Sequence, residues 1–465
     1  MKREKMACKP HVLVLPYPRQ GHINPMLQFA KLLSHRGLKT TLVLTVGITK
    51  SMHGEVGSVG IETISDGYDD EHAREKDTIE AILQRLQSVG SRTLAELIER
   101  MKASGHPVSC IVYDAILPWP LDVARDLGVL GAAFLTQPCI VDAVYYHAYR
   151  GSLAVPPVGS TFQLTGLPEL GDSDLPSFVS VPGYSPTHLK LLVNQFSNME
   201  TADWVLCNTF QELENEAINW MANYMPMKAI GPMVPSIYIN AHLDGDKNYG
   251  VDLWKADGAV MNWLDKREPH SVVYVSFGSI SKVGPEQMEE LAWGLGKSSH
   301  YFLLVVRTRE KDKIPMKFME ETKEKGLVVP WCPQPEVLAH KAIGCFVTHC
   351  GWNSTLEAIS LGVPMVAVPL WTDQPTNAKC VKDIWRVGVR AGVDENGIVR
   401  RDEIERCIKM VMEGEKAIEI NGSARKWREL AMKALMEDGP SNKNINDFVA
   451  RLATKKDLKS ITSAS

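Results

Sequence analysis

Short apolar runs alternate with longer amphipathic segments along most of the chain. In the first half, the apolar runs predict strands at 11–15, 39–45, 108–113, 132–135 and 204–208. Helical patterns lie between them, and the first helix is expected to begin at Pro25, because a proline costs no hydrogen bond in the first turn. Apolar strands separated by helices are typical of a parallel sheet with crossover helices. The pattern therefore predicts an α/β fold.

The same alternation restarts in the second half. Before it, prolines, glycines and polar residues break every period over 231–257, which we interpret as a linker. Further strands are predicted at 271–276, 302–306, 327–329, 345–348 and 365–368, with helices at 285–298, at 355–361 and from Arg401 onward. Two halves of one architecture place a cleft between them, which suits an enzyme with two substrates. We expect domains at 1–245 and 246–440, and a C-terminal helix and tail at 441–465 that can pack back on the first domain.

Composition narrows the class of protein. The 465 residues are 45% apolar and 23% charged, a balance typical of a globular chain of two or three domains. A net charge of −4 provides no basic surplus for binding nucleic acid or an anionic membrane. The nine cysteines are scattered without a C-x-x-C pair, which indicates a reducing compartment and no zinc site. Since no apolar run approaches the ~20 residues of a membrane span, we expect a cytoplasmic protein.

The loop after the first strand, residues 16–25, contains the first candidate chemistry. It has one glycine, Gly21, and so lacks the G-x-G-x-x-G fingerprint of a nicotinamide oxidoreductase. Gly21 lets the backbone approach a ligand closely. His22 follows it, and histidine is the natural general base near neutral pH. The alternative interpretation is a structural histidine that caps the loop.

Asp114 ends the strand predicted at 108–113, on the same rim of the sheet as His22. A carboxylate there can accept a hydrogen bond from the imidazole and stabilise the imidazolium that forms when the base takes a proton. The alternative is an aspartate that caps the helix after Pro118. The sequence supports both interpretations about equally.

Three groups of polar and aromatic residues follow strands of the second half and begin at Trp331, His349 and Trp371. The carboxyl ends of parallel strands face one crevice, so these groups are expected to lie together. Trp331 offers a flat face on which a base can stack. An anion site is predicted where a helix begins, from backbone N–H groups with His349, Gly351, Asn353 and Ser354.

The remaining polar residues of this segment suit hydroxyl groups. Glu357 can accept two hydroxyls of a ribose, and Asp373 and Gln374 offer an acceptor and a donor to a sugar. Each residue taken singly also fits a core or surface position. Their joint order, however, covers a base, a ribose, a diphosphate and a sugar along one crevice.

The 44 residues 331–374 match, nearly position for position, the signature box of plant secondary-product glycosyltransferases, the UDP-sugar-dependent family 1. Gly21-His22, Asn24-Pro25 and Asp114 also match, so the sequence resembles this family over nearly its whole length. The resemblance implies a GT-B fold, in which two Rossmann-like domains with parallel sheets face a central cleft. It also implies inverting chemistry, no metal or other cofactor, and a UDP-sugar as donor substrate.

The resemblance assigns roles within the donor site. It implies that uracil stacks on Trp331 and pairs with the Cys332 backbone, and that Gln334 and Glu357 hold the ribose. It implies that the diphosphate is held by His349, Asn353, Ser354 and Ser279. It also implies that the sugar is held by Trp352, Asp373 and Gln374. Most relatives with a terminal glutamine in the box use glucose, so Gln374 favours UDP-glucose over UDP-galactose.

The expected reaction is a direct displacement. His22 removes a proton from the acceptor hydroxyl, Asp114 steadies the imidazolium, and an α-linked donor gives a β-glucoside. The acceptor is expected to be a small hydrophobic plant metabolite, a terpenoid, steroid or phenolic, that offers a hydroxyl or a carboxyl, and the enzyme is expected to be a monomer. Acceptor contacts are expected from the N-terminal half, where Pro118, Trp119, Phe134, Gln137, Tyr145, Tyr146, Phe178 and Phe196 serve equally well as core residues.

Two further points stay open on the sequence. Arg19 stands where relatives usually carry a small residue, and it can contact the diphosphate, narrow the acceptor mouth or point to solvent. Alternative functions on the same fold are a nucleotide-sugar epimerase or hydrolase and a non-catalytic sensor. The first has no use for an apolar acceptor pocket, and the intact His22 and Asp114 pair argues against the second.

Overall fold

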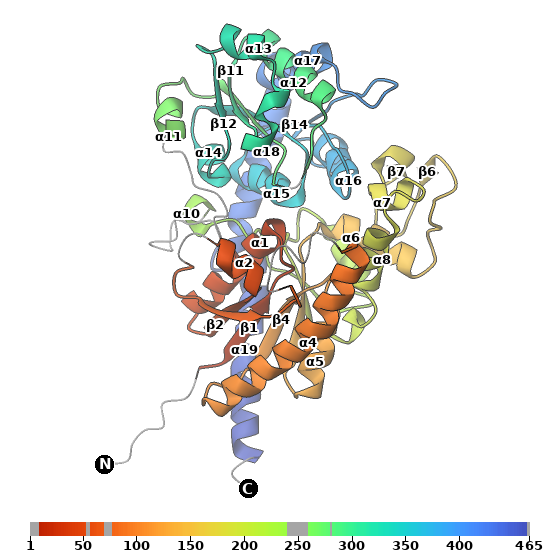
Figure 1. Cartoon of the computed structure of the whole chain (residues 1–465), viewed down its shortest axis with the longest axis vertical. Helices are drawn as coiled ribbons and strands as arrows, with labels where there is room; N and C mark the ends of the chain where they lie inside the picture. The colour runs from red at the N-terminus through yellow and green to blue at the C-terminus, as the bar shows by residue number, and fades with distance from the viewer. Residues whose placement is uncertain (1–8, 53–55, 69–76, 240–258, 280, 463–465) are drawn as a thin grey trace.

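The computed structural model describes residues 9–52, 56–68, 77–239, 259–279 and 281–462. Figure 1 shows two α/β domains stacked along the long axis of the molecule, the N-terminal domain below and the C-terminal domain above. Each contains a parallel sheet with helices on both faces. This confirms the expected GT-B class of fold.

The N-terminal domain is built on a seven-stranded sheet in the order β3-β2-β1-β4-β5-β8-β9. Its strands are β1 (His11–Leu15), β2 (Lys39–Thr45), β3 (Gly60–Ile64), β4 (Cys110–Asp114), β5 (Leu130–Leu135), β8 (Trp204–Cys207) and β9 (Met227–Ala229). Its helices are α1 (Gln20–His35), α2 (Val46–Ser51), α4 (Ile79–Ala103), α5 (Trp119–Asp126), α6 (Cys139–Tyr149), α7 (Ser177–Ser180), α8 (Pro186–Asn194), α9 (Asn215–Met221) and α10 (Ser236–Ile239). All neighbouring strands run parallel, as the apolar runs separated by helices predicted.

The C-terminal domain repeats the design with six parallel strands in the order β12-β11-β10-β13-β14-β15. The strands are β10 (Val272–Ser276), β11 (Tyr301–Val305), β12 (Gly326–Val329), β13 (Ile343–Thr348), β14 (Met365–Ala367) and β15 (Gly388–Arg390). The helices are α11 (Ala259–Leu264), α12 (Pro285–Lys297), α13 (Met316–Glu321), α14 (Gln334–Ala339), α15 (Trp352–Leu361), α16 (Gln374–Lys379), α17 (Arg401–Met412), α18 (Gly414–Leu435) and α19 (Pro440–Thr462).

Alternate residues of each strand enter different cores, because side chains of a strand point to opposite faces. On β1, Val12 and Val14 pack in the cluster that contains residues of α1 and α19. Leu13 and Leu15 pack in the cluster on the other face, with residues of α4, α5 and α6. Both faces of the sheet are therefore covered, and its carboxyl edge is left for the site.

The start of α1 differs from the prediction. The helix begins at Gln20, not at Pro25, and Pro25 lies inside it. The backbone of Arg19 is extended, and its carbonyl accepts hydrogen bonds from the N–H groups of His22 and Ile23 at 3.0 and 2.9 Å. The first turn therefore closes before the proline, and His22 belongs to the helix. Similarly, α15 begins at Trp352, three residues before the expected start.

The long C-terminal helix α19 returns to the N-terminal domain (Figure 1). Phe448 packs against Trp204 and Phe29, with ring centroids 4.8 and 5.9 Å apart. Asn444 donates a 2.8 Å hydrogen bond to the carbonyl of Ala229 on β9. The division expected between 245 and 246 falls outside the described residues. Among the helices that the structure describes, none is long and apolar enough to span a membrane.

The proline-rich and glycine-rich segment 151–187 forms an arm of the N-terminal domain. It contains the two-stranded sheet of β6 (Thr161–Phe162) and β7 (Leu170–Gly171), the short 3-10 helix η1 (Asp172–Asp174) and α7. In Figure 1 the arm stands beside α16 of the upper domain, which η1 contacts. The arm thus crosses from one domain to the other.

Candidate active site

His22 and Asp114 meet at the carboxyl edge of the N-terminal sheet. His22 lies in the first turn of α1 and Asp114 is the last residue of β4, and His22 Nδ1 lies 2.7 Å from Asp114 Oδ2. The Asp114 side chain is fully buried, whereas the His22 side chain is 23% exposed. The N–H of Tyr17 also donates to Oδ2, at 3.2 Å. With Nδ1 held by the carboxylate, Nε2 is the nitrogen that can take a proton.

Thr136 is a third member of this group that the sequence interpretation did not single out. Its Oγ1 lies 3.0 Å from His22 Nδ1. Thr136 directly follows β5, the neighbour of β4 in the sheet. The rule that located Asp114, a polar residue at the carboxyl end of a buried strand, would also have located Thr136.

The imidazole of His349 lies between two glycine backbones. A Cβ atom at Gly351 would come within 2.5 Å of His349 Nε2, and one at Gly278 within 2.9 Å. Only glycine leaves room for the ring at these positions, and Gly278 also has a φ of +71°. Burial lowers the pKa of His349 to about 4. The ring is therefore neutral at pH 7 and offers an N–H group, not a positive charge.

The N-terminus of α15 faces α1 across the cleft. Gly351 is its N-cap, and no side chain caps the helix, so N–H groups of the first turn are available to an anion. The side-chain amide of Asn353 donates a 2.7 Å hydrogen bond to the carbonyl of Gly21. This bond places the candidate diphosphate site directly beside the residue that precedes His22.

Gln334, Ser354 and Glu357 form one hydrogen-bonded group. Nε2 of Gln334 donates to Glu357 Oε2 at 2.8 Å and to Ser354 Oγ at 2.9 Å. The hydroxyl of Tyr274 on β10 donates to Gln334 Oε1 at 3.1 Å and lies 3.4 Å from Cys332 Sγ. Tyr274 was not among the predicted residues. It ties the start of α14, which follows Trp331, to the sheet below.

Asp373 and Gln374 lie at the start of α16. Asp373 Oδ2 accepts a 2.7 Å hydrogen bond from the Asn377 amide, and burial raises the pKa of Asp373 to about 6. Gln374 Oε1 accepts hydrogen bonds from the N–H groups of Leu370 and Trp371, at 2.9 and 3.1 Å. The side chain of Gln374 thus closes the loop that precedes its own helix.

Two predicted donor residues have other contacts. The indole N–H of Trp352 donates to the carbonyl of Asn208 in the N-terminal domain at 2.9 Å, and its ring packs 6.1 Å from that of Trp385. The Trp352 side chain is therefore engaged in the domain interface. Ser279 is exposed, and its carbonyl accepts a 2.6 Å hydrogen bond from Arg307. That contact ties the loop after β10 to the segment that follows β11.

The candidate acceptor residues separate into different environments. Phe134 packs 5.7 Å from Phe29, on the sheet face covered by α1 and α19. Phe178 lies on the arm and packs 5.8 Å from Trp371 of the C-terminal domain. Tyr145 is fully buried in α6, a helix that contacts α16.

The remaining features of the site are the position of Arg19 and the grouping of side chains that could bind a metal ion. Arg19 is exposed, at the N-cap of α1. No group of three or more His, Cys, Asp or Glu side chains is arranged to hold a metal ion within the part of the chain that the structure describes.

Two parallel-sheet domains, with the His22 and Asp114 pair on one and the uncapped N-terminus of α15 facing it on the other, are typical of glycosyltransferases of the GT-B class. Residues 208–420 match the family model described as UDP-glucoronosyl and UDP-glucosyl transferase. The chain is 48% identical over 446 residues to UDP-glycosyltransferase 74E2 of Arabidopsis thaliana, and the aligned region covers 95% of this chain and 98% of that protein. It is 45% identical over 459 residues to flavonol 7-O-beta-glucosyltransferase UGT74F1 of the same plant, covering 97% and 100%.

Os79 from O. sativa, crystallised in complex with UDP, superposes with a TM-score of 0.90 at 41% identity, covering 95% of this chain and 100% of that one. The chain belongs to the UDP-glycosyltransferase family, and it is a transferase that takes a UDP-sugar as its donor.

Proposed function

We propose that the protein transfers glucose from UDP-glucose to a hydroxyl of a small hydrophobic plant metabolite and gives a β-glucoside. The observation that carries this proposal is the 2.7 Å contact between His22 and Asp114, set across the cleft from the open N-terminus of α15. A base and an anion site on opposite sides of one cleft suit a displacement in which a proton leaves the acceptor and a diphosphate leaves the donor.

In the proposed reaction, Nε2 of His22 takes the proton of the acceptor hydroxyl as its oxygen attacks the anomeric carbon. The Asp114 carboxylate stabilises the resulting imidazolium through Nδ1–H. The bond between the anomeric carbon and the UDP oxygen breaks on the opposite face, so configuration inverts. Thr136 Oγ1, 3.0 Å from the same Nδ1, helps to fix the ring.

The C-terminal domain would hold the nucleotide. Trp331, two residues after β12, would stack on uracil, and the Cys332 backbone would pair with the edge of the base. Glu357, buried and linked to Gln334 at 2.8 Å, would accept the ribose hydroxyls. These assignments follow the resemblance, and the hydrogen-bonded group of Gln334 and Glu357 supports them.

The leaving diphosphate would be bound by N–H groups at the start of α15, by Asn353 and Ser354, by Ser279 and by the neutral imidazole of His349. Donors aimed at developing negative charge are often the largest catalytic contribution. We propose that this set acts without a metal ion. Activity that persists in excess EDTA would support this statement, and loss of activity restored by Mg²⁺ would contradict it.

The sugar would lie against Asp373 and Gln374, the acceptor and donor expected for glucose hydroxyls. Any contact from Trp352 would use its backbone, because its indole N–H is already engaged with Asn208. Tighter binding and faster transfer of UDP-glucose than of UDP-galactose would test the role of Gln374.

We propose a hydroxyl as the main acceptor group, because its proton must be removed and the pair of His22 and Asp114 is suited to removing it, whereas a carboxyl is already ionised at pH 7 and depends less on a base. The flavonol named for one relative is a phenolic acceptor, which supports phenolics among the candidate classes.

The test is mass spectrometry of reactions with UDP-glucose and a panel of phenols, terpenoids, steroids and carboxylic acids. We expect a product one hexose heavier than a hydroxyl acceptor and cleaved by a β-glucosidase. His22→Ala should lower turnover at least ~100-fold. His35→Ala, an exposed histidine at the far end of α1, is the matched control and should leave turnover unchanged. Conversion of UDP-glucose without acceptor would favour an epimerase or hydrolase, and UDP binding without any glycoside would favour a sensor.

We also propose a cytoplasmic monomer. The eight cysteines described by the structure are buried and are not joined in disulfides, as expected for a reducing compartment. Fluorescence microscopy of a tagged chain and sedimentation analysis test the two statements separately.

A further inference from the structure

The loop before α16 is held by a residue of the other domain. The N–H of Ser177 donates to the carbonyl of Thr372 at 2.9 Å, and the N–H of Thr372 donates to Ser177 Oγ at 2.6 Å. Both backbone hydrogen-bonding groups of Thr372 are thus directed to one residue of the arm. Ser177 is 9% exposed, so the contact is shielded from water.

Thr372 has an unfavourable backbone conformation that needs such support. Its φ is +56°, in the left-handed region, where a β-branched residue is rare. Strained backbone of this kind persists where its surroundings fix it, and it clusters at ligand sites. Thr372 directly precedes Asp373 and Gln374, so its peptide orientation sets the direction of the proposed sugar-binding residues.

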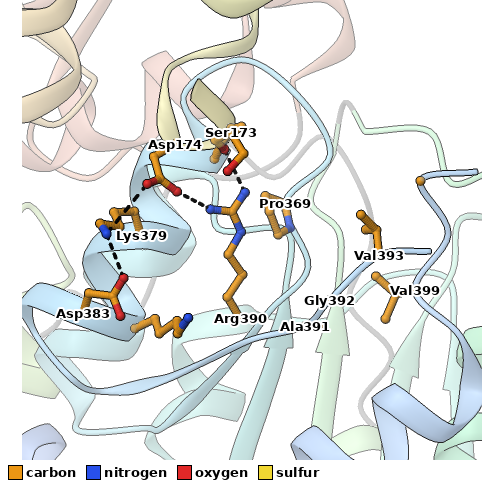
Figure 2. A pocket seen from close by; sticks show the side chains of 13 residues that line it. Ser173, Asp174, Pro369, Lys379, Asp383, Arg390, Ala391, Gly392, Val393 and Val399 are labelled. Atoms are coloured by element: carbon orange, nitrogen blue, oxygen red, sulfur yellow. Dashed lines mark hydrogen bonds and ion pairs between the residues drawn. The ribbon is translucent and has the colours of Figure 1, made fainter. Parts of the chain in front are cut away.

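A second set of contacts anchors the arm to the same region of the C-terminal domain (Figure 2). Arg390 Nη1 donates to Asp174 Oδ1 at 2.7 Å, and its Nη2 donates to the carbonyl of Ser173 at 2.9 Å. Lys379 Nζ lies 3.7 Å from Asp174 Oδ2. The hydroxyl of Thr376 in α16 donates to the carbonyl of Asp174 at 2.6 Å. The arm is therefore fixed at both its side chains and its backbone.

We propose that Ser177 of the N-terminal domain is a positioning residue for the donor sugar and helps to determine which sugar is accepted. It holds Thr372, and Thr372 holds Asp373 and Gln374 toward the sugar. This inference rests on the proposed function, in which Asp373 and Gln374 contact the sugar. Its consequence is that sugar selectivity is shared between the domains and is not a property of the signature box alone.

Calorimetric titration of the full-length protein with UDP-glucose, UDP-galactose and UDP tests the proposal without an acceptor. Ser177→Ala removes the oxygen that accepts from the Thr372 N–H. The affinity of this variant for UDP-glucose should fall about 3- to 10-fold, the range for one hydrogen bond. The ratio of its affinity for UDP-glucose to its affinity for UDP-galactose should become smaller than in wild type. Its affinity for UDP should stay within about twofold of wild type, because UDP carries no sugar.

Ser173→Ala is the matched control. Ser173 lies in the same arm but contributes only its carbonyl to Arg390, so this variant should bind all three ligands as wild type does. Asp174→Ala loses the anchor to Arg390 and should shift the ratio of UDP-glucose to UDP affinity in the same direction as Ser177→Ala. If Ser177→Ala folds poorly, Asp174→Ala still allows the ratio of UDP-glucose to UDP affinity to be measured.

Three outcomes would overturn the proposal. An unchanged ratio in both Ser177→Ala and Asp174→Ala would show that the sugar loop does not depend on the arm. An equal loss of UDP and UDP-glucose affinity would show that Ser177 only supports the domain interface. Wild-type protein that neither distinguishes UDP-glucose from UDP nor transfers glucose would overturn the proposed function, and this inference with it.

Discussion

The side-chain amide of Asn353 donates a 2.7 Å hydrogen bond to the main-chain carbonyl of Gly21, joining the first turns of α15 and α1 across the cleft. In a regular α-helix, the carbonyl of Gly21 would accept a hydrogen bond from the N–H of the residue four positions later in the chain. That residue is Pro25, which has no N–H and whose ring displaces the carbonyl from the helix axis. A proline inside α1 therefore frees the acceptor that Asn353 uses.

Replacing Pro25 tests this relationship. Pro25→Ala supplies an N–H that competes with Asn353 for the Gly21 carbonyl, so we expect the KM for UDP-glucose to rise about 2- to 5-fold while the thermal midpoint stays level or rises, since alanine favours a helix. Steady-state kinetics and thermal unfolding measure the two effects.

Pro285→Ala is the control for Pro25→Ala. Pro285 is the first residue of α12, where an N–H has no partner in the helix, so this variant should leave the KM unchanged. A Pro25→Ala enzyme with wild-type KM would show that the freed carbonyl has no role in bringing the two helices together.

Asp114→Asn tests the orientation of the base. An amide nitrogen in place of Oδ2 cannot accept from His22 Nδ1–H, so the ring is expected to turn to the tautomer whose Nε2 carries the proton and cannot act as a base. Turnover with a hydroxyl acceptor should fall at least ~100-fold, while UDP affinity stays the same. A variant that retained more than a tenth of the wild-type turnover would argue against this pair as the base.

The binding of UDP-glucose should depend on pH through Asp373. Burial raises the pKa of this carboxyl to about 6, so it is ionised at pH 7 and mainly protonated at pH 5. A protonated carboxyl accepts fewer sugar hydroxyls, and affinity should fall up to about tenfold between these pH values. His349, whose pKa is about 4, stays neutral over most of this range and does not contribute the same signal.

Asp373→Asn provides the comparison for the pH effect. Its affinity for UDP-glucose should be lower at pH 7 and nearly independent of pH from 7 to 5, because the titrating group is absent. If calorimetry gives wild type and Asp373→Asn the same pH dependence, the carboxyl does not contact the sugar.

Trp352→Phe separates a role in the interface from a role in sugar binding. The substitution leaves the buried Asn208 carbonyl without its donor, which costs about 1–3 kcal/mol, and the thermal midpoint should fall. The ratio of UDP-glucose to UDP affinity should not change. A selective loss of UDP-glucose affinity would instead indicate that the indole contacts the sugar.

The sequence predicted most of what is local. Strands such as His11–Leu15 and Lys39–Thr45 match the structure residue for residue, because each contains a run of consecutive apolar residues, as buried parallel strands do. The short strands β3, β9 and β15 were not predicted. Each is the edge of its sheet or short enough to show no period, as with the three residues of Gly388–Arg390.

The active-site residues, likewise, were predicted in part from the sequence and in part decided by the tertiary structure. His22 and Asp114 were found from the sequence, because polar residues at the ends of parallel strands meet at one edge. The register between β1 and β4 then decides that they meet at 2.7 Å. The helix that contains His22 starts five residues earlier than predicted, since the extended backbone at Arg19, and not the proline, begins it.

By itself the sequence determined the two α/β halves, the strand ends that contain the site and the family to which the signature segment points. Only the tertiary structure decided that Trp352 turns to Asn208, that Pro25 frees the Gly21 carbonyl for Asn353, and that Ser177 holds Thr372. The physical reason is how far apart along the chain the interacting residues lie. Periodicity and turn chemistry depend on neighbours along the chain, whereas each of these contacts joins backbone and side-chain groups more than a hundred residues apart, whose meeting depends on how the two domains face each other.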